Sequence, residues 1–155
     1  MNDKDFMREA IELSLKNIEE EGGPFGAVIV KDGEIIAKGT NRVTTNNDPT
    51  AHAEINAIRK ATQKLGTFDL SGCRIYSSCE PCPMCLGAIY WARLDAIYFA
   101  NTKADARDID FDDSFIYEEL EKPIEKRKIS TKQILREEAM AAFNKWRTKD
   151  DKIEY

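Results

Sequence analysis

Two short motifs place metal-binding side chains at well separated points of this chain. His52 stands two residues before Glu54, and Cys82 and Cys85 lie in a Pro-Cys-Pro-Met-Cys run. Imidazole and thiolate are ligands that zinc prefers, and three of them leave one position of a tetrahedral ion for water. The two segments can serve one ion only if the fold brings them together, which constrains the architecture more than any other feature.

Each motif is expected at the start of a helix. Proline suits the first helical position, so Pro83 predicts Cys82 at the N-cap and Cys85 on the same face one turn later. The positive end of the helix favours thiolate, the form that binds metal. His52 and Glu54 lie about 200° apart around a regular helix, so they converge only if His52 lies at its irregular start. We therefore expect two helix starts to meet around one zinc ion.

Glu54 is a carboxylate that this ligand set does not require. Beside the metal but not bound to it, a carboxylate could take a proton from activated water and later give it to a leaving amine. His-x-Glu followed by Pro-Cys-x-x-Cys is also the signature of zinc deaminases. His52 is the only histidine in the chain, and a lone histidine is ordinarily structural, but its pairing with these motifs reverses that expectation. The residues favour hydrolytic removal of an amine.

Cys79 allows two other metal assignments. Its spacing from Cys82 and Cys85 matches the start of an iron–sulfur run, but that pattern needs a further cysteine where this chain has Ile89. Alternatively, Cys79 completes a closed structural zinc site with His52 and the two later cysteines. In that arrangement the glutamate of the first motif would be incidental.

The apolar pattern predicts alternating helices and strands. The Asp32-Gly33 pair between two apolar runs is a strong hairpin signal, so the first two strands should be antiparallel neighbours. The later strand, helix, strand order is typical of parallel pairing, which makes the chain an α/β protein with a mixed sheet. The expected elements are helix 3–21, strands 27–30 and 35–37, loop 42–50, helix 51–65 capped by Asp48 or Thr50 and ended by Gly66, strand 74–77, helix 83–93, strand 96–100, an acidic loop to 113, and helices 115–120 and 131–148.

Length and composition fit one domain. The 155 residues, of which 42% are hydrophobic, can bury a single core without disulfides. The longest uncharged apolar stretch, residues 84–92, is too short to span a membrane, and the charged start carries no export signal. We therefore expect one domain over residues 1–155, a cytoplasmic location with reduced thiols, and Cys73 as a small buried hydrophobe.

The charge of the chain disfavours nucleic acid as a partner. The formal net charge is −5, so no global positive field attracts a phosphate backbone. The most basic stretch, residues 122–128, is interrupted and flanked by acidic residues, which is typical of a solvated loop. Neither DNA nor structured RNA is therefore the expected substrate.

At its motifs the chain resembles the cytidine deaminase superfamily, and the sequence segments around these motifs resemble the bacterial guanine deaminases within it. The zinc motif is common to the superfamily, whereas a Phe-Asp-Asp-Ser-Phe-Ile-Tyr run and the closing Tyr155 are narrower marks. The resemblance covers nearly the whole chain and is least informative over residues 121–138. Asp110 stands where the family pattern has a glycine. The stretches that carry the resemblance are residues 23–30, 46–54, 78–93 and 111–117.

The resemblance implies a three-layer α/β/α fold with a mixed five-stranded sheet and one Zn²⁺ per subunit. His52, Cys82 and Cys85 would hold the zinc. Glu54 would shuttle the proton as hydroxide attacks C2 of guanine, which releases ammonia and leaves xanthine. Asp113 in the acidic loop would assist at the exocyclic amine. The implied role is a hydrolase of purine salvage or catabolism.

The resemblance also implies how the purine base is held. Asn41 would hydrogen-bond the base, and Phe25 and Trp91 would be apolar or stacking walls of the pocket. The family forms homodimers that exchange the C-terminal segment, so Tyr155 would close the pocket of a partner subunit. From the residues alone, the segment that ends in Tyr155 would be a helix with a frayed end.

Three alternatives stay open at this point. The sequence does not show whether the pocket closes around a ribose, so a guanosine or other nucleoside deaminase shares every motif above. The tRNA adenosine deaminases share the zinc motif but act on RNA. Outside enzymes, a zinc-stabilised interaction module would use the same ligands, with Cys79 filling the fourth position.

Overall fold

A hairpin begins the sheet in the computed structural model, which describes every residue from 1 to 155. Asp32 and Gly33 both take positive φ values, 50° and 80°, as a tight turn between antiparallel strands requires. The flanking strands are β1 (Gly26–Lys31) and β2 (Glu34–Thr40), and they pair in antiparallel register. The predicted hairpin is confirmed.

The sheet has four strands in the order β2-β1-β3-β4, with β3 (Cys73–Cys79) antiparallel to β1 and parallel to β4 (Ala96–Asn101). The mixed sheet is confirmed, but the expected fifth strand is absent. After β4 the Thr102 side chain accepts a hydrogen bond from the Asp105 backbone, and the Asp105 carboxylate accepts one from the Thr102 backbone. This capping box starts helix α5 (Lys103–Asp108), so the chain turns into a helix where a loop was expected.

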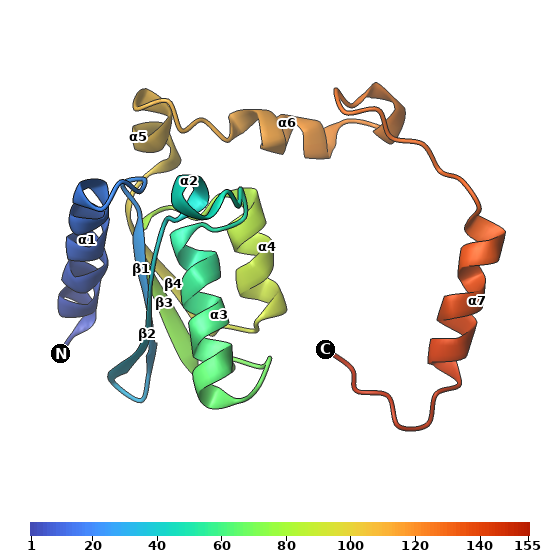
Figure 1. Cartoon of the computed structure of the whole chain (residues 1–155), viewed down its shortest axis with the longest axis horizontal. Coiled ribbons are helices and arrows are strands. Elements are labelled where there is room, and N and C mark those ends of the chain that lie inside the picture. Colours follow the sequence, from blue (N-terminus) through green and yellow to red (C-terminus); the bar gives the residue numbers. More distant parts are fainter. The chain divides into compact units, whose positions relative to one another are not determined.

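Alternate residues of the central strands enter two separate apolar cores, because successive side chains of a strand point to opposite faces. In β3, Ile75 packs in one core and Tyr76 in the other, and β1 alternates in the same way. Figure 1 shows α1 (Asp3–Glu19) on one side of the sheet and α3 (Ala53–Leu65) and α4 (Pro83–Trp91) on the other. The three-layer α/β/α arrangement is therefore present around this sheet.

Helix α3 starts at a different residue from its predicted caps. His52 is the N-cap, with an extended backbone and no capping hydrogen bond from its side chain. Asp48 instead accepts hydrogen bonds from the backbone and the hydroxyl of Thr50. These bonds close a turn before the helix, so the prediction of Asp48 or Thr50 as the cap is wrong. The segment expected as a loop also holds a single helical turn, α2 (Val43–Asn46).

The chain divides into two compact units, residues 1–113 and residues 114–155. The second unit contains α6 (Ser114–Glu121), a short 3₁₀ helix, η1 (Ile124–Lys126), and α7 (Arg136–Arg147), which begins later than the predicted residue 131. None of its side chains is buried, so this unit has no core of its own. No helix of either unit combines the length and the apolar character needed to cross a membrane.

Candidate functional site

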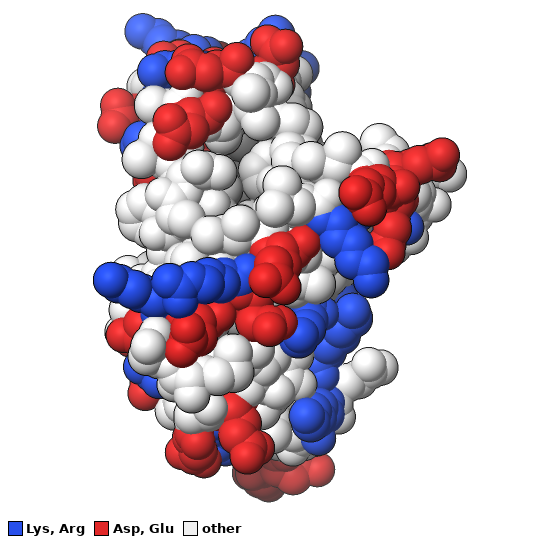
Figure 2. All heavy atoms as spheres, turned by 90° about the vertical axis from the view of Figure 1, so that its left-hand side faces the viewer, with Lys and Arg blue, Asp and Glu red and all other residues white.

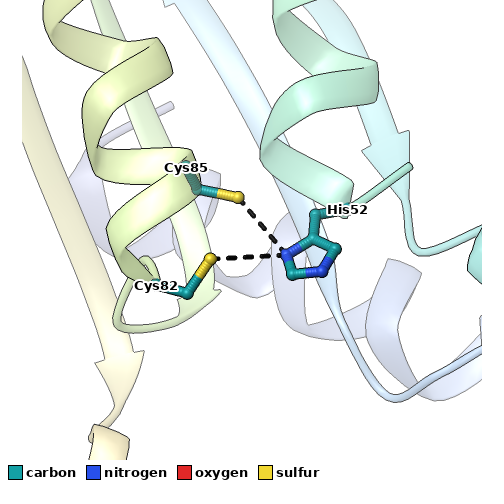
Figure 3. A group of neighbouring side chains, drawn as sticks. All are labelled: His52, Cys82 and Cys85. Atoms are coloured by element: carbon teal, nitrogen blue, oxygen red, sulfur yellow. Dashed lines mark hydrogen bonds between the residues drawn. The ribbon is translucent and has the colours of Figure 1, made fainter. Parts of the chain in front are cut away.

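Two helix starts bring the three predicted ligands together. His52 is the N-cap of α3, Cys82 is the N-cap of α4, and Cys85 lies in the first turn of α4. Pro83 occupies the first helical position, as its fixed φ favours. The ligand atoms of the three residues all lie within 4.8 Å of one another, and Figure 3 shows both sulfurs pointing at the imidazole. The predicted meeting of two helix starts is confirmed.

The spacing of these atoms fits a zinc ion. His52 Nδ1 lies 3.6 Å from Cys82 Sγ and 3.4 Å from Cys85 Sγ. A tetrahedral zinc with Zn–N bonds of about 2.0 Å and Zn–S bonds of about 2.3 Å separates nitrogen from sulfur by about 3.5 Å. One imidazole and two thiolates also form the donor set that zinc prefers. The residues therefore fit zinc in both chemistry and spacing.

The two cysteine sulfurs share protons unequally. Hydrogen bonds from Cys85 and then from His52 lower the pKa of the Cys82 thiol to about 4, so Cys82 is a thiolate at neutral pH. The pKa of Cys85 is raised, because its thiol donates to Cys82 and because it is buried. The pKa of His52 is raised by its hydrogen bond with Cys82. Metal binding must therefore displace the proton of Cys85.

Glu54 lies beside the three ligands but is not one of them. Only 5% of the residue is exposed, and this burial raises the pKa of its carboxyl group. Ser77 Oγ donates a hydrogen bond of 3.0 Å to Glu54 Oε1. A carboxylate that is buried, held and adjacent to the metal ligands is placed to receive and return a proton. The role of Glu54 in moving that proton stays a prediction.

Cys79 does not join the cluster, so neither of the two alternatives that use it is present. It is absent from the group of metal-binding side chains, and its Sγ donates instead to the backbone oxygen of Thr102 at 3.8 Å. Burial raises the pKa of the Cys79 thiol to about 11, so it stays protonated. Cys73 is fully buried in the apolar core, as predicted.

Asn41 is held at the end of β2 by its backbone and its side chain. Its backbone N–H donates to Phe25 O at 3.2 Å, and its Oδ1 accepts from Val43 N at 3.2 Å. The backbone oxygen of Asn41 accepts a 2.8 Å hydrogen bond from Asn17 Nδ2. The residue is 8% exposed. Asn41 therefore has a fixed position close to Phe25.

The sequence did not point to Asn17, although it organises this region. Asn17 is completely buried, and its Nδ2 also donates to Gly23 O at 2.8 Å. Its Oδ1 accepts from Arg42 Nη1 at 3.1 Å. A Cβ on Gly22 would collide with the Asn17 side chain, so only glycine fits there. The sequence signal for a buried polar residue was that Asn17 lies on the same face of the helix as the apolar Phe6 and Ala10.

Ser77 also escaped prediction. Alternation along β3 places it on the same face as Cys73 and Ile75, which both belong to the apolar core. The sequence signal was a serine at a position where the alternation of β3 predicts a buried apolar side chain. No local motif links that position to Glu54, because the two residues meet only through the fold.

Phe25 and Asp113 belong to the first unit. The Phe25 ring packs edge-to-face against Phe111, with 5.0 Å between ring centroids. Burial raises the pKa of Asp113, and the negative charge of Cys82 acts in the same direction. Asp110, which stands in place of a glycine, has a φ of 70°. This left-handed conformation is one that glycine adopts freely and aspartate tolerates.

Trp91 lies far along α4 from the metal ligands, and Tyr155 lies in the second unit. Trp91 is the last residue of α4, at the opposite end from the cysteines, and is 69% exposed. Tyr155 belongs to the second unit and is 73% exposed. The structure therefore brings together His52, Cys82 and Cys85 as a possible metal site, and the roles of Asn41, Phe25, Asp113, Trp91 and Tyr155 stay predictions.

Comparison with known proteins finds a family and several relatives. The family model of the cytidine and deoxycytidylate deaminase zinc-binding region matches residues 1–101. Guanine deaminase of Bacillus subtilis (strain 168) is 54% identical over 156 residues, which covers 100% of this chain and 100% of that protein. The X-ray structure of guanine deaminase from Bacillus subtilis gives a TM-score of 0.97 and covers 100% of this chain and 99% of that one.

Two further relatives match over shorter stretches. Guanine deaminase from Nitrosomonas europaea has a TM-score of 0.70 at 38% identity, covering 72% of this chain and 65% of that chain. The tRNA-specific adenosine deaminase of Aquifex aeolicus is 42% identical over 95 residues, which covers 61% of this chain and 63% of that protein. Of these three relatives, the Bacillus protein alone is matched along the whole chain.

Proposed function

Because this chain belongs to the family of the cytidine and deoxycytidylate deaminase zinc-binding region, we propose that it hydrolyses guanine to xanthine and ammonia. The observation that carries the reaction type is a buried carboxylate, Glu54, beside a three-ligand zinc site. The full-length similarity to a guanine deaminase supports the choice of base. The enzyme is a zinc-dependent aminohydrolase.

His52, Cys82 and Cys85 would hold zinc, which would act as a Lewis acid and lower the pKa of water to near neutral. Glu54 accepts a proton as the oxygen of water bonds to C2 of guanine. The same carboxyl group then returns the proton to the exocyclic nitrogen, the C2–N bond breaks, and ammonia leaves. Asp113 assists at the departing amine. Water and guanine are consumed, and xanthine and ammonia are produced.

The base is held by side chains of the first unit. Asn41 hydrogen-bonds the purine ring, and its fixed backbone supports that role. Phe25 forms an apolar wall, supported by its contact with Phe111. Trp91 is a further candidate wall, although it lies at the far end of α4 from the metal ligands.

The tRNA deaminase alternative has weaker support. Its relative matches only 61% of this chain, and the net charge of −5 offers no attraction for RNA. On the face shown in Figure 2, basic and acidic side chains are interspersed. Ion pairs of the structure include Arg8–Asp5 and Lys38–Glu9. No specific observation favours a nucleic acid substrate.

The second unit completes the enzyme through a partner subunit. It has no buried side chain, and its large apolar residues include Phe115, which is 59% exposed, and Phe143, which is 69% exposed. Exposed apolar surface of this kind marks an interface. The chain forms one deaminase domain in a homodimer that exchanges the C-terminal segment, and Tyr155 closes the pocket of the partner.

The site also implies a compartment and a role. Thiolate ligands persist where thiols stay reduced, which supports the cytoplasm. Release of ammonia from a purine base supports a role in purine catabolism or salvage.

The test is a substrate panel. Purified, zinc-loaded protein is incubated with guanine, guanosine, adenine, adenosine and cytosine, and ammonia and the ultraviolet spectrum are followed. Conversion of guanine to xanthine without reaction of guanosine supports the proposal. Preferential reaction of guanosine would replace it with a nucleoside deaminase, and inosine formation in a tRNA anticodon arm would replace it with an RNA editor.

A further inference from the structure

Ser77 places a hydroxyl where the strand otherwise carries apolar side chains. It is 1% exposed and lies on the face of β3 that packs against the core containing Cys73 and Ile75. A buried hydroxyl without a partner costs free energy, so a serine at this position needs a hydrogen bond. Its side chain finds that partner in Glu54 Oε1, at 3.0 Å.

Ser77 lies in a strand that is paired on both sides, whereas the position of the Glu54 carboxylate depends on the torsions of a long side chain. β3 is an inner strand, and Ser77 pairs with Ala27 on one side and with Phe99 on the other. Glu54 sits in the first turn of α3 and reaches the site through three side-chain torsions. The hydrogen bond from Ser77 restricts where the Glu54 carboxylate lies, alongside the hydrogen bond between Glu54 and Cys85.

We propose that Ser77 is a positioning residue that sets the orientation of the Glu54 carboxylate for proton transfer. Holding Oε1 fixes rotation about the last bond of the side chain, so the other oxygen keeps a defined direction. The proposal rests on the proposed function, in which Glu54 moves the proton. Ser77 itself does not touch the substrate or the metal ligands in this role.

The neighbouring Ser78 offers a matched control. It is 2% exposed, and its Oγ accepts a 3.0 Å hydrogen bond from Gly26 N instead of contacting Glu54. Ser77→Ala and Ser78→Ala each remove one buried hydroxyl from consecutive positions of the same strand. A purely structural role for Ser77 predicts similar consequences for the two variants.

The experiment compares Ser77→Ala, Ser77→Thr and Ser78→Ala with wild-type enzyme. Measurements are kcat and KM for guanine, zinc content and thermal unfolding. A hydrogen bond to a charged group is worth enough that Ser77→Ala should lose about tenfold or more in kcat, with KM and zinc content nearly unchanged. Ser77→Thr, which keeps the hydroxyl, should recover most of kcat. Ser78→Ala should be less stable but keep its kcat.

Three results would overturn the proposal. The first is wild-type kcat in Ser77→Ala, and the second is an equal loss of kcat in Ser78→Ala. The third is a crystal structure of Ser77→Ala in which the Glu54 carboxylate keeps its wild-type orientation, a readout that does not depend on the identity of the substrate. Failure of the proposed function would be distinguishable, because the wild-type enzyme itself would then release no ammonia from guanine.

Discussion

Residues 1–113 and residues 114–155 differ in where their stability and their chemistry come from. The first unit buries two apolar cores and holds three zinc ligands with Glu54. The second unit contains helices but buries no side chain. The reaction chemistry therefore resides in the part that can hold its own shape. The part without a core carries Tyr155, whose proposed role depends on a second copy of the chain.

The largest effect expected is loss of the metal. Dialysis against a chelator should abolish ammonia release, because the ligands of the first unit then activate no water. It should also lower the temperature at which the first unit unfolds, since metal binding stabilises the folded state. Added zinc should restore both properties. Activity that persists at zero metal content, measured by atomic absorption, would contradict the assignment of the site.

Replacement of Glu54 comes next. Glu54→Gln keeps the size of the side chain but removes its ability to carry a proton, so kcat should fall by about 10²- to 10⁴-fold. Zinc content should stay at the wild-type value, because Glu54 is not a ligand. The matched control is Glu118→Gln, which alters an exposed carboxylate of the second unit and should leave kcat unchanged. A large loss of zinc in Glu54→Gln would instead make Glu54 a ligand.

Asn17 tests how far the first unit depends on one buried polar residue. Asn17→Ala leaves the backbone oxygens of Gly23 and Asn41 without their donor, so the free energy of unfolding should fall by about 2–4 kcal/mol. Because Asn41 loses a support, KM for guanine should also rise. Asn46→Ala, at an exposed position of α2, is the control. The free energies of unfolding of both variants are measured in urea. Equal midpoints of unfolding for Asn17→Ala and Asn46→Ala would contradict the proposed importance of Asn17.

The smallest effect belongs to the second unit. Tyr155→Ala should raise KM for guanine by about tenfold, as expected for loss of one aromatic contact of about 1.5 kcal/mol. Zinc content and unfolding of the first unit should not change. Ile153→Ala, also at an exposed position of the tail, should keep a wild-type KM. If Tyr155→Ala does so as well, the tail does not close the pocket and the contrast between the units becomes sharper.

Local signals explain most of what the sequence could predict. The hairpin followed from Asp32-Gly33 and the N-cap position of Cys82 from Pro83, because each depends on the conformational preferences of one or two residues. The zinc ligands followed from their chemistry. The capping box between Thr102 and Asp105 is equally local, so the start of α5 could have been recognised, and the expectation of a loop there was avoidable.

The remaining features depend on contacts between distant segments. Ser77 meets Glu54 across 23 residues of sequence, and Asn17 meets Asn41 across 24. No pattern within either segment specifies such a pair. A four-stranded rather than a five-stranded sheet is likewise a property of the whole fold. Motif chemistry therefore predicts the metal ligands and the carboxylate beside them, whereas the buried polar residues that contact Glu54 and Asn41 depend on the fold.

His52 and Cys82 both occupy N-cap positions, and neither side chain makes a capping hydrogen bond. An N-cap side chain ordinarily holds an amide of the first turn, and its loss costs about 1 kcal/mol. Bound zinc would instead link the two N-cap residues and stabilise the first turns of both helices. Hydrogen exchange of the first-turn amides of α3 and α4 should then slow together as zinc binds. The exchange rates of two segments that are distant in the sequence would therefore both report the zinc occupancy of one site.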